Sequence, residues 1–244
     1  MKAMIFAAGL GTRLKPLTDT MPKALVPLAG KPLLQWQVEK LRDAGIKDII
    51  VNVHHFPDMI IDTIRANDGW GCNIVVSDER NALLDTGGGL KKACRLLMDN
   101  GTMDKEPILA CNVDILSNID LHVLIAEYNR TGISQLVVSE RKTQRYLCFD
   151  ENNRLCGWTN IATGDLKGAD GTHLAFSGMQ ILSPEALNLI AQKPEDPFSL
   201  IDFYLASMHQ VVLKAFVPAN YRMMDVGKIN QIEEAEHFAE SLNA

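Results

Sequence analysis

The sequence predicts an α/β protein built on a doubly wound, mixed but mostly parallel sheet, with a smaller antiparallel part toward the C-terminus. Three observations lead to this fold class. Hydrophobic residues make up 47% and charged residues 22% of the 244 residues, a mixture typical of a globular protein with a full core. Short apolar runs alternate with segments of helical period over the first two thirds of the chain. From about residue 145 onward, closely spaced strands replace this alternation.

The alternation can be followed along the chain. Residues 3–8 are nearly all apolar and end at Gly9, which indicates a buried strand. Residues 32–44 carry apolar side chains at helical spacing, and Gly45 follows as a stop signal. By the same criteria, further strands are predicted at residues 48–53, 73–77, 107–112 and 135–139, and further helices at residues 57–67, 90–98 and 120–128.

The remaining residues predict a mixture of antiparallel strands and helices. Strands are expected at residues 146–150, 154–158 and 174–182, with residues 151–153 as a hairpin turn. Residues 161–172 are polar and contain glycine, so they are predicted to form a loop. Helices are expected at residues 184–192, 198–208 and 229–242. Because no linker or repeat interrupts the chain, we expect a single domain over residues 1–244.

Charge and hydropathy exclude two classes of partner. The 30 acidic and 24 Lys and Arg residues give a net charge of -6, whereas nucleic-acid binding requires clustered cations. The apolar N-terminal run stops at Gly9 and is followed by Arg13 and Lys15, so it is too short for a signal peptide. No segment approaches the roughly 18 apolar residues of a membrane span. We therefore expect a cytoplasmic protein that binds neither nucleic acid nor membrane.

The five cysteines show no metal-ligand or CxxC spacing. Cys72, Cys111 and Cys148 lie in or beside apolar, strand-like runs, which favours buried free thiols in a reducing compartment. No Ser-His-Asp or Cys-His pattern supports covalent catalysis. His54 and His55 follow the second predicted strand, and a structural hydrogen-bonded role is expected for them.

A glycine-rich loop directly after the first strand is the strongest chemical signal. Gly9 and Gly11 allow a sharp turn whose amide groups can approach an anion, and Arg13 and Lys23 supply the cations that a triphosphate requires. The alternative is a plain glycine turn with two surface cations. Two familiar phosphate loops are excluded, because a P-loop needs GK[ST] and the dinucleotide fingerprint needs a third glycine where Leu14 stands.

Two acids are candidates for metal binding. Asp114 ends the apolar run ILACNVD of residues 108–114, which places a carboxylate at the carboxyl edge of the sheet. Magnesium takes one or two such carboxylates and completes its shell with phosphates and water. The alternative for Asp114 is a helix cap, but Ser117 and Asn118 are available for that role. Asp225 precedes the last predicted helix, so on its own it reads as an ordinary helix-start residue.

A third segment, DTGGG at residues 85–89, precedes a predicted helix. Three consecutive glycines let a flat ligand lie against bare backbone, and their amides can face the edge of a nucleobase. A flexible loop is the alternative, although three glycines would then cost conformational entropy without a gain.

The stretch GLGTRLKPLT at residues 9–18, followed by Pro22 and Lys23, resembles the signature of the sugar-1-phosphate nucleotidyltransferases. The short single-domain members, similar to N-acetylmuramate 1-phosphate uridylyltransferase, are the most alike, because they too lack a C-terminal β-helix. The resemblance implies a Rossmann-like nucleotidyltransferase fold. It also implies a nucleotide-binding part at about residues 1–140 and an acceptor-side part at about residues 141–244.

The resemblance further implies roles for individual residues. Arg13 and Lys23 match the catalytic residues that grip the triphosphate, with Lys23 at the α-phosphate. Asp114 and Asp225 match the two acids that bind Mg²⁺. Two departures are present, Val113 for a glycine and Asp85 for a glutamate. The residues expected to bind the nucleotide are Ala8, Gly9, Gly11, Thr12, Glu79, Gly87 and Gly88.

The acceptor side matches the family less well. The segment Phe176-Ser177-Gly178 resembles the family's sugar-side segment, so Gly178 and Asn112 are expected to bind the acceptor. Many longer relatives carry a Glu-Lys pair upstream, where this chain has residues 157–160, GWTN. The identity of the sugar is therefore left open.

We expect in-line displacement, in which the acceptor phosphate attacks the α-phosphorus of a nucleoside triphosphate and pyrophosphate leaves. The expected partners are a nucleoside triphosphate and a sugar 1-phosphate, in a monomer or small homo-oligomer. Two alternatives remain open, a cytidylyltransferase for phosphocholine or a similar alcohol phosphate, and a silent regulator that binds a nucleotide sugar. The nucleobase is not determined.

Overall fold

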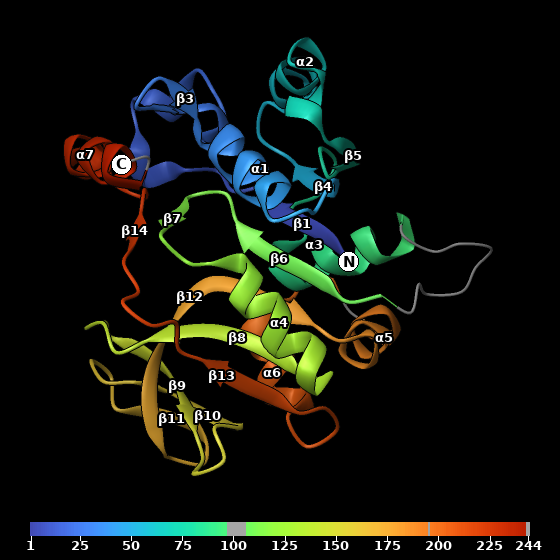
Figure 1. Ribbon diagram of the computed structural model, residues 1–244, viewed down its shortest axis with the longest axis vertical. Helices are drawn as coiled ribbons and strands as arrows, with labels where there is room; N and C mark the ends of the chain where they lie inside the picture. The colour runs from blue at the N-terminus through green and yellow to red at the C-terminus, as the bar shows by residue number, and fades with distance from the viewer. Residues whose placement is uncertain (97–105, 195, 243–244) are drawn as a thin grey trace. The chain divides into compact units, whose positions relative to one another are not determined.

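The computed structural model describes residues 1–96, 106–194 and 196–242. The chain divides into two compact units, each containing parts that are distant in sequence (Figure 1). Unit 1 consists of Met1–Leu84, Ala110–Ile119 and Arg222–Ala244. Unit 2 consists of Asp85–Leu109 and Asp120–Tyr221.

A parallel sheet forms the centre of unit 1. Its strands run in the order β6, β1, β4, β5, and the last three residues of β6 belong to this unit. Ala3 of β1 pairs with Ile49 of β4, and Asp48 of β4 pairs with Asn73 of β5, both in parallel register. Strands β1, β4 and β6 are buried along most of their length because they are short apolar runs, whereas β5 at the edge is largely exposed or half-buried. The strands are β1 (Lys2–Phe6), β4 (Asp48–Val53), β5 (Asn73–Asp78) and β6 (Ile108–Asn112).

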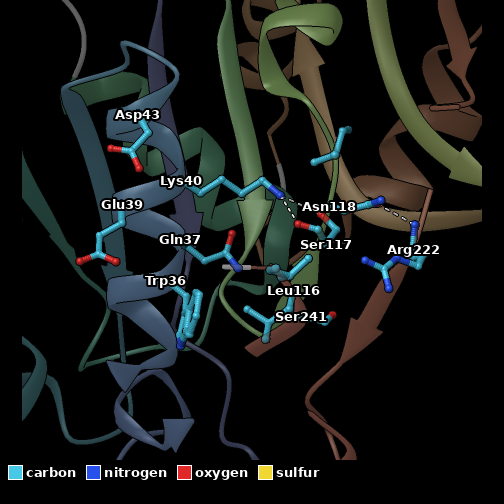
Figure 2. A pocket seen from close by; sticks show the side chains of 12 residues that line it. Trp36, Gln37, Glu39, Lys40, Asp43, Leu116, Ser117, Asn118, Arg222 and Ser241 are labelled. Atoms are coloured by element: carbon cyan, nitrogen blue, oxygen red, sulfur yellow. Dashed lines mark hydrogen bonds between the residues drawn. The ribbon is translucent and has the colours of Figure 1, made fainter. Parts of the chain in front are cut away.

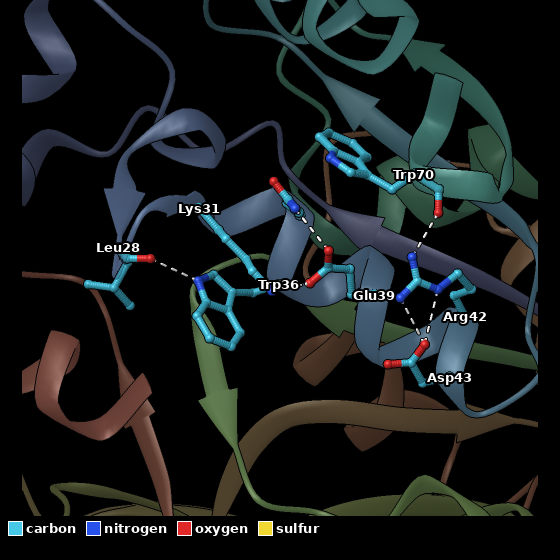
Figure 3. A network of polar contacts seen from close by, with 8 residues as sticks. Leu28, Lys31, Trp36, Glu39, Arg42, Asp43 and Trp70 are labelled. Carbon is cyan, nitrogen blue, oxygen red and sulfur yellow. Dashed lines mark hydrogen bonds and ion pairs between the residues drawn. The ribbon is translucent and has the colours of Figure 1, made fainter. Parts of the chain in front are cut away.

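Helix α1 (Leu33–Asp43) buries an apolar stripe that includes Leu34, Val38 and Leu41. Burying each such side chain contributes roughly 1.5–3 kcal/mol. Polar contacts also hold α1 (Figure 3). The Trp36 indole donates to the Leu28 carbonyl at 3.0 Å, and the Arg42 guanidinium donates to the carbonyl of Trp70 at 3.0 Å.

A two-stranded antiparallel ribbon also belongs to unit 1, and the sequence patterns did not predict it. Strand β7 (Ile115–Ser117) pairs with β14 (Met223–Asp225), and Asp225 lies opposite Ile115 (Figure 1). Helix α7 (Ile232–Leu242) follows β14 and contacts the short strand β2 (Pro27–Leu28). The remaining regular elements of the unit are α2 (Pro57–Ala66), β3 (Lys31–Pro32), and the 3-10 turns η1 (Thr12–Leu14), η2 (Leu17–Asp19), η3 (Lys23–Leu25), η4 (Asp68–Gly71) and η5 (Ile229–Gln231).

Unit 2 is built on a mainly antiparallel sheet. Strands β11, β10, β9 and β12 lie side by side in this order, and β8 pairs with β12 on one side and β13 on the other. The pairing of β8 with β13 is parallel, and the others are antiparallel. The strands are β8 (Ser134–Ser139), β9 (Arg145–Phe149), β10 (Leu155–Asn160), β11 (Asp165–Gly168), β12 (Thr172–Leu182) and β13 (Leu213–Phe216).

Capping residues begin three helices of unit 2. Side-chain oxygens of Asp120, Ser183 and Ser199 each accept a backbone N–H from the first turn of the helix that follows. Ser183 also precedes a proline at the first helical turn. The helices are α3 (Asp85–Leu96), α4 (Leu121–Thr131), α5 (Pro184–Gln192) and α6 (Leu200–Ser207).

The predicted fold class is confirmed, since a mostly parallel sheet occurs together with antiparallel strands. Two local predictions were wrong. Residues 165–168 form strand β11 inside the predicted loop; all four are exposed, so no apolar period marks this edge strand. Helix α3 begins at Asp85, five residues before its predicted start, and the glycines lie inside it. Its predicted end at Met98 lies outside the described residues.

The cysteines are free thiols, as predicted. Cys111 and Cys148 are buried, but Cys72 is only half-buried because it lies in the connection before β5 rather than in the strand. None of the helices in the described part of the chain combines the length and apolar composition that crossing a membrane requires.

Candidate active site

The glycine-rich loop follows β1 in unit 1, and its conformation requires glycine at one position. Gly11 has φ +64°, and a Cβ there would lie 2.9 Å from the Thr18 methyl group and 3.0 Å from Lys23 Cβ. The Thr18 hydroxyl donates to the Gly11 carbonyl at 2.9 Å, which fixes the turn. Gly9, Thr12 and Arg13 are exposed on this loop, whereas Ala8 is buried. The exposed groups are therefore accessible to a ligand.

Lys23 and Asp114 form an ion pair. The Lys23 ammonium contacts the Asp114 carboxylate, and the two side chains are only 10% and 17% exposed. Turn η3 carries Lys23, and Asp114 directly precedes β7. Two residues 91 positions apart in sequence therefore meet in unit 1 with opposite charges.

Asp225 and Arg13 also meet, beside a glycine. A Cβ on Gly227 would lie 2.6 Å from Asp225 Oδ1 and 3.0 Å from Arg13 Nη2, so both groups lie directly against this backbone. The Val226 amide donates to the Asp114 carbonyl at 2.8 Å, which ties β14 to the residue before β7. The four predicted charged residues are thus gathered around the ends of one ribbon.

The donor set at the ribbon fits a hard divalent cation. Asp114 and Asp225 provide carboxylate oxygens from two adjacent strands, and Mg²⁺ takes one or two protein carboxylates in sites where phosphates complete its shell. Lys23 and Arg13 provide the positive charge that a polyphosphate needs. Unit 1 therefore offers a charge-paired site suited to a metal-bound triphosphate.

Glu79 lies in a buried hydrogen-bond network. Its side chain belongs to a residue only 2% exposed, and one carboxylate oxygen accepts from Asn52 Nδ2 at 2.8 Å. The side-chain oxygen Oδ1 of Asn52 accepts from the backbone amide of Ala7 at 2.8 Å, at the start of the glycine loop. Asn52 was missed in the sequence, where its only signal is an amide in an otherwise apolar strand. This arrangement positions the loop, and the expected contact of Glu79 with a nucleobase stays a prediction.

The two neighbouring histidines have structural partners, as expected. His54 Nδ1 lies 2.7 Å from the Glu79 carbonyl, and His55 Nε2 lies 3.1 Å from the Thr18 carbonyl. Both contacts brace the segments that carry the loop.

Gly87 and Gly88 belong to unit 2, where Phe198 explains the need for glycine. Their amides both donate to the Phe198 carbonyl, at 2.9 and 3.2 Å. A Cβ on Gly87 would lie 2.3 Å from the Phe198 ring. At Gly87 the close approach is made by the Phe198 ring rather than by a flat ligand, and a nucleobase role for the amides of Gly87 and Gly88 stays a prediction.

The two expected acceptor-side residues fall in different units. Asn112 ends β6 in unit 1 and is half-buried. Gly178 lies within β12 of unit 2 at φ +68°, where the pairing with β8 shifts register between Phe176 and Gln180. The strand is therefore irregular at Gly178, and the contact of this residue with an acceptor stays a prediction.

Comparison with known proteins identifies the family. Residues 2–154 match the family described as "Nucleotidyl transferase". The chain belongs to this family. N-acetylmuramate alpha-1-phosphate uridylyltransferase of Caulobacter vibrioides is 33% identical over 213 residues, which are 83% of this chain and 82% of that protein. The protein of the same name from Neisseria meningitidis serogroup B is 42% identical over 120 residues, 49% of each chain.

A solved structure agrees over the whole length of this nucleotidyl transferase. HddC from Yersinia pseudotuberculosis, complexed with GMP-PN, shares 28% identity with a TM-score of 0.75, covering 98% of this chain and 99% of that one. The resemblance found in the glycine loop and the acids therefore extends over the fold.

Helix α1 of this nucleotidyl transferase holds the ribbon that carries both acids (Figure 2). Gln37 Nε2 donates to the Ile115 carbonyl at 2.7 Å, and Lys40 Nζ donates to the Ser117 carbonyl at 2.5 Å and hydroxyl at 3.0 Å. Burial lowers the pKa of Lys40 to about 8. Sequence patterns missed both side chains, since a Gln and a Lys on a helix normally read as surface residues.

A second clamp joins the two strands of the ribbon. The Asn118 amide donates to the Arg222 carbonyl at 3.1 Å, and the Arg222 amide donates to Asn118 Oδ1 at 2.7 Å (Figure 2). These groups line a hollow of about 360 Å³ together with Gln37 and Lys40. Side chains of α1 thus fix β7, and the hydrogen bonds between Asn118 and Arg222 fix one end of the ribbon.

Proposed function

We propose that this chain transfers a nucleoside monophosphate from a nucleoside triphosphate to a sugar 1-phosphate and releases pyrophosphate, with Mg²⁺ bound by Asp114 and Asp225. One observation carries the proposal. Unit 1 gathers Arg13, Lys23, Asp114 and Asp225 at the ends of the β7–β14 ribbon, behind a glycine loop with exposed backbone.

The chemistry needs alignment more than proton transfer. A phosphate monoester is already a nucleophile, so its oxygen attacks the α-phosphorus and the bond to the pyrophosphate oxygen breaks without a general base. The loop backbone and Arg13 hold the β- and γ-phosphates, which become the leaving group. Lys23 stabilises the negative charge that develops at the α-phosphate. Mg²⁺ held by Asp114 and Asp225 would supply the positive charge that offsets the repulsion between the two phosphate groups.

The Lys23–Asp114 ion pair suggests how the site is set. Asp114 would hold Mg²⁺ through the carboxylate that pairs with the Lys23 ammonium, and the Lys23 ammonium would then be available to the α-phosphate. The ion pair itself leaves neither of these two largely buried charges uncompensated.

We propose UTP as the donor and the 1-phosphate of an N-acetylmuramate-type sugar as the acceptor. The support is the uridylyltransferase of Caulobacter vibrioides, which matches this chain over most of both lengths. GTP is the second candidate donor, because the Yersinia pseudotuberculosis structure of matching length holds GMP-PN.

The test is pyrophosphate release across four ribonucleoside triphosphates and a panel of acceptors. The panel contains N-acetylmuramate, N-acetylglucosamine, glucose and mannose 1-phosphates, plus phosphocholine, each with and without Mg²⁺. Release with one triphosphate and one sugar phosphate, abolished by chelation, is expected. Release only with phosphocholine would replace the acceptor class. Binding of nucleotide without release in any combination would contradict the enzyme proposal and favour a regulator.

A further inference from the structure

Unit 2 carries a cluster of one thiol, one carboxylate and one imidazole. Cys148 lies on β9, His173 lies on β12, and Asp170 lies in the turn before β12. One ligand atom from each of the three side chains lies within 4.8 Å of the others. Strand pairing explains the cluster, because His173 is directly opposite Cys148 in the antiparallel β9–β12 ladder. Side chains that are opposed in this way share one face of the sheet, with Cβ atoms about 4.5–5.5 Å apart.

Further contacts set the orientation of the three groups. His173 Nε2 lies 2.6 Å from Asp170 Oδ1, and the same carboxylate oxygen accepts the Gly171 amide at 2.9 Å. The imidazole ring stacks on Tyr146, with centroids 5.8 Å apart and planes inclined by 22°. The Cys156 thiol donates to the Cys148 carbonyl at 3.3 Å, which holds the neighbouring strand β10 against the cluster.

We propose that Cys148, Asp170 and His173 form a zinc site, with a water molecule in the fourth position. Sulfur, nitrogen and carboxylate oxygen together are the ligands of Zn²⁺, and three protein ligands with one open position is a common zinc arrangement. Mg²⁺ would not compete there, because it prefers an all-oxygen shell.

The geometry requires only a small contraction. Ligand atoms around a tetrahedral Zn²⁺ are roughly 3.5 Å apart, given bonds of about 2.0–2.3 Å. The hydrogen bond between His173 and Asp170 would open slightly, the thiol of Cys148 would close in, and the imidazole proton would move to Nδ1.

Charge balance supports a divalent ion at this place. A thiolate from the buried Cys148 and the carboxylate of Asp170 together carry two negative charges, which Zn²⁺ neutralises. The turn before β12 would then be fastened to β9.

The experiment is equilibrium dialysis of the full chain against ZnCl₂ in excess Mg²⁺, with metal content measured by mass spectrometry. We expect one zinc ion per wild-type chain, and an affinity at least about tenfold weaker in Cys148→Ser and His173→Gln. Cys94→Ser removes a buried thiol of the same unit outside the cluster, and it should bind as the wild type does. Equal zinc binding by wild type and Cys148→Ser would overturn the proposal.

A second measurement does not depend on any variant folding. Wild-type protein loaded with Co²⁺ should show a thiolate-to-cobalt charge-transfer band, together with the visible absorption of a tetrahedral ion. Cobalt bound without the charge-transfer band would refute the site. The readout is metal ligation, so the result is independent of whether the chain transfers nucleotides.

Discussion

Lys23 is a nearly buried cation of the candidate site, and its position is fixed by its neighbours. Its ammonium pairs with Asp114, and a Cβ at Gly11 would lie 3.0 Å from its Cβ, so the Lys23 side chain is held between the glycine loop and Asp114. A surface lysine would lose several rotatable bonds on meeting a phosphate. The Lys23 side chain has already lost this rotational freedom on folding, so its positive charge is pre-positioned.

Lys23→Ala should therefore reduce turnover by roughly 10²–10³-fold, because a donor aimed at developing phosphate charge is lost. The pyrophosphate-release assay measures the effect, and the melting temperature reports on stability. Lys47→Ala, which removes an exposed lysine of the same unit, is the matched control and should leave turnover unchanged. Near-normal turnover in Lys23→Ala would remove this residue from the mechanism.

Gly11 gives a second prediction at the residue scale. Gly11→Ala should lower the free energy of unfolding by about 1–2 kcal/mol, because φ +64° disfavours a side chain and the Cβ would press on Thr18. Urea denaturation measures the change. Gly9→Ala is the control, since no atom lies within 4 Å of a Cβ there. Equal stability of the two variants would show that the loop relaxes around the added carbon.

The elements that the sequence predicts well are those whose signal is local. Strand β4 and helix α5 agree with their predicted bounds, because each is a continuous apolar or amphipathic run. Strands β7 and β14 have three residues each and pair across about a hundred positions, so no local period reveals them. The predicted start of α3 was too late because glycine is a poor helix former, so the three glycines were placed before the helix. In the structure they lie inside it, and Gly87 packs against Phe198.

The candidate site divides in the same way. Arg13, Lys23 and Asp114 could be singled out because charge near a glycine loop, or at the end of an apolar strand, is visible in sequence, whereas Asp225 was pointed to only by the family resemblance. Gln37, Lys40 and Asn52 could not be singled out. Their partners are backbone carbonyl and amide groups of segments that come close only when the chain folds.

Lys40, which links α1 to the ribbon, should make the free energy of unfolding depend on pH. The pKa of Lys40 is about 8 in the folded chain, below its ordinary value of about 10.4, because burial disfavours the charged form. Between these two values the unfolded chain keeps the proton and the folded chain does not, so stability contributed by this residue rises with pH.

The measurement compares wild type with Lys40→Met by urea denaturation at pH 7 and pH 10. The difference in free energy of unfolding should move in favour of the wild type by about 1–3 kcal/mol across this range. Other groups that titrate in the same range cancel in the difference. A difference that does not change with pH would show that Lys40 keeps its charge when folded.

At the scale of the whole molecule, ligand binding should appear as stability. Mg²⁺ with the correct triphosphate, at a concentration of 100 times Kd, should stabilise the folded chain by about 2.7 kcal/mol through binding linkage. Calorimetry measures the rise in melting temperature. Asp114→Asn should abolish most of it, whereas Lys47→Ala should retain it. A full rise in Asp114→Asn would show that the triphosphate binds without this acid.

The order of the chain has a consequence for biosynthesis. Unit 1 is assembled from three segments, and its last segment starts at Arg222, after every residue of unit 2. Lys23 and Asp114 are synthesised long before Asp225, yet β7 has no partner strand until β14 has been made. A nascent chain on the ribosome therefore carries an unpaired β7 edge, and only one of the two acids beside the ribbon, until β14 has been synthesised.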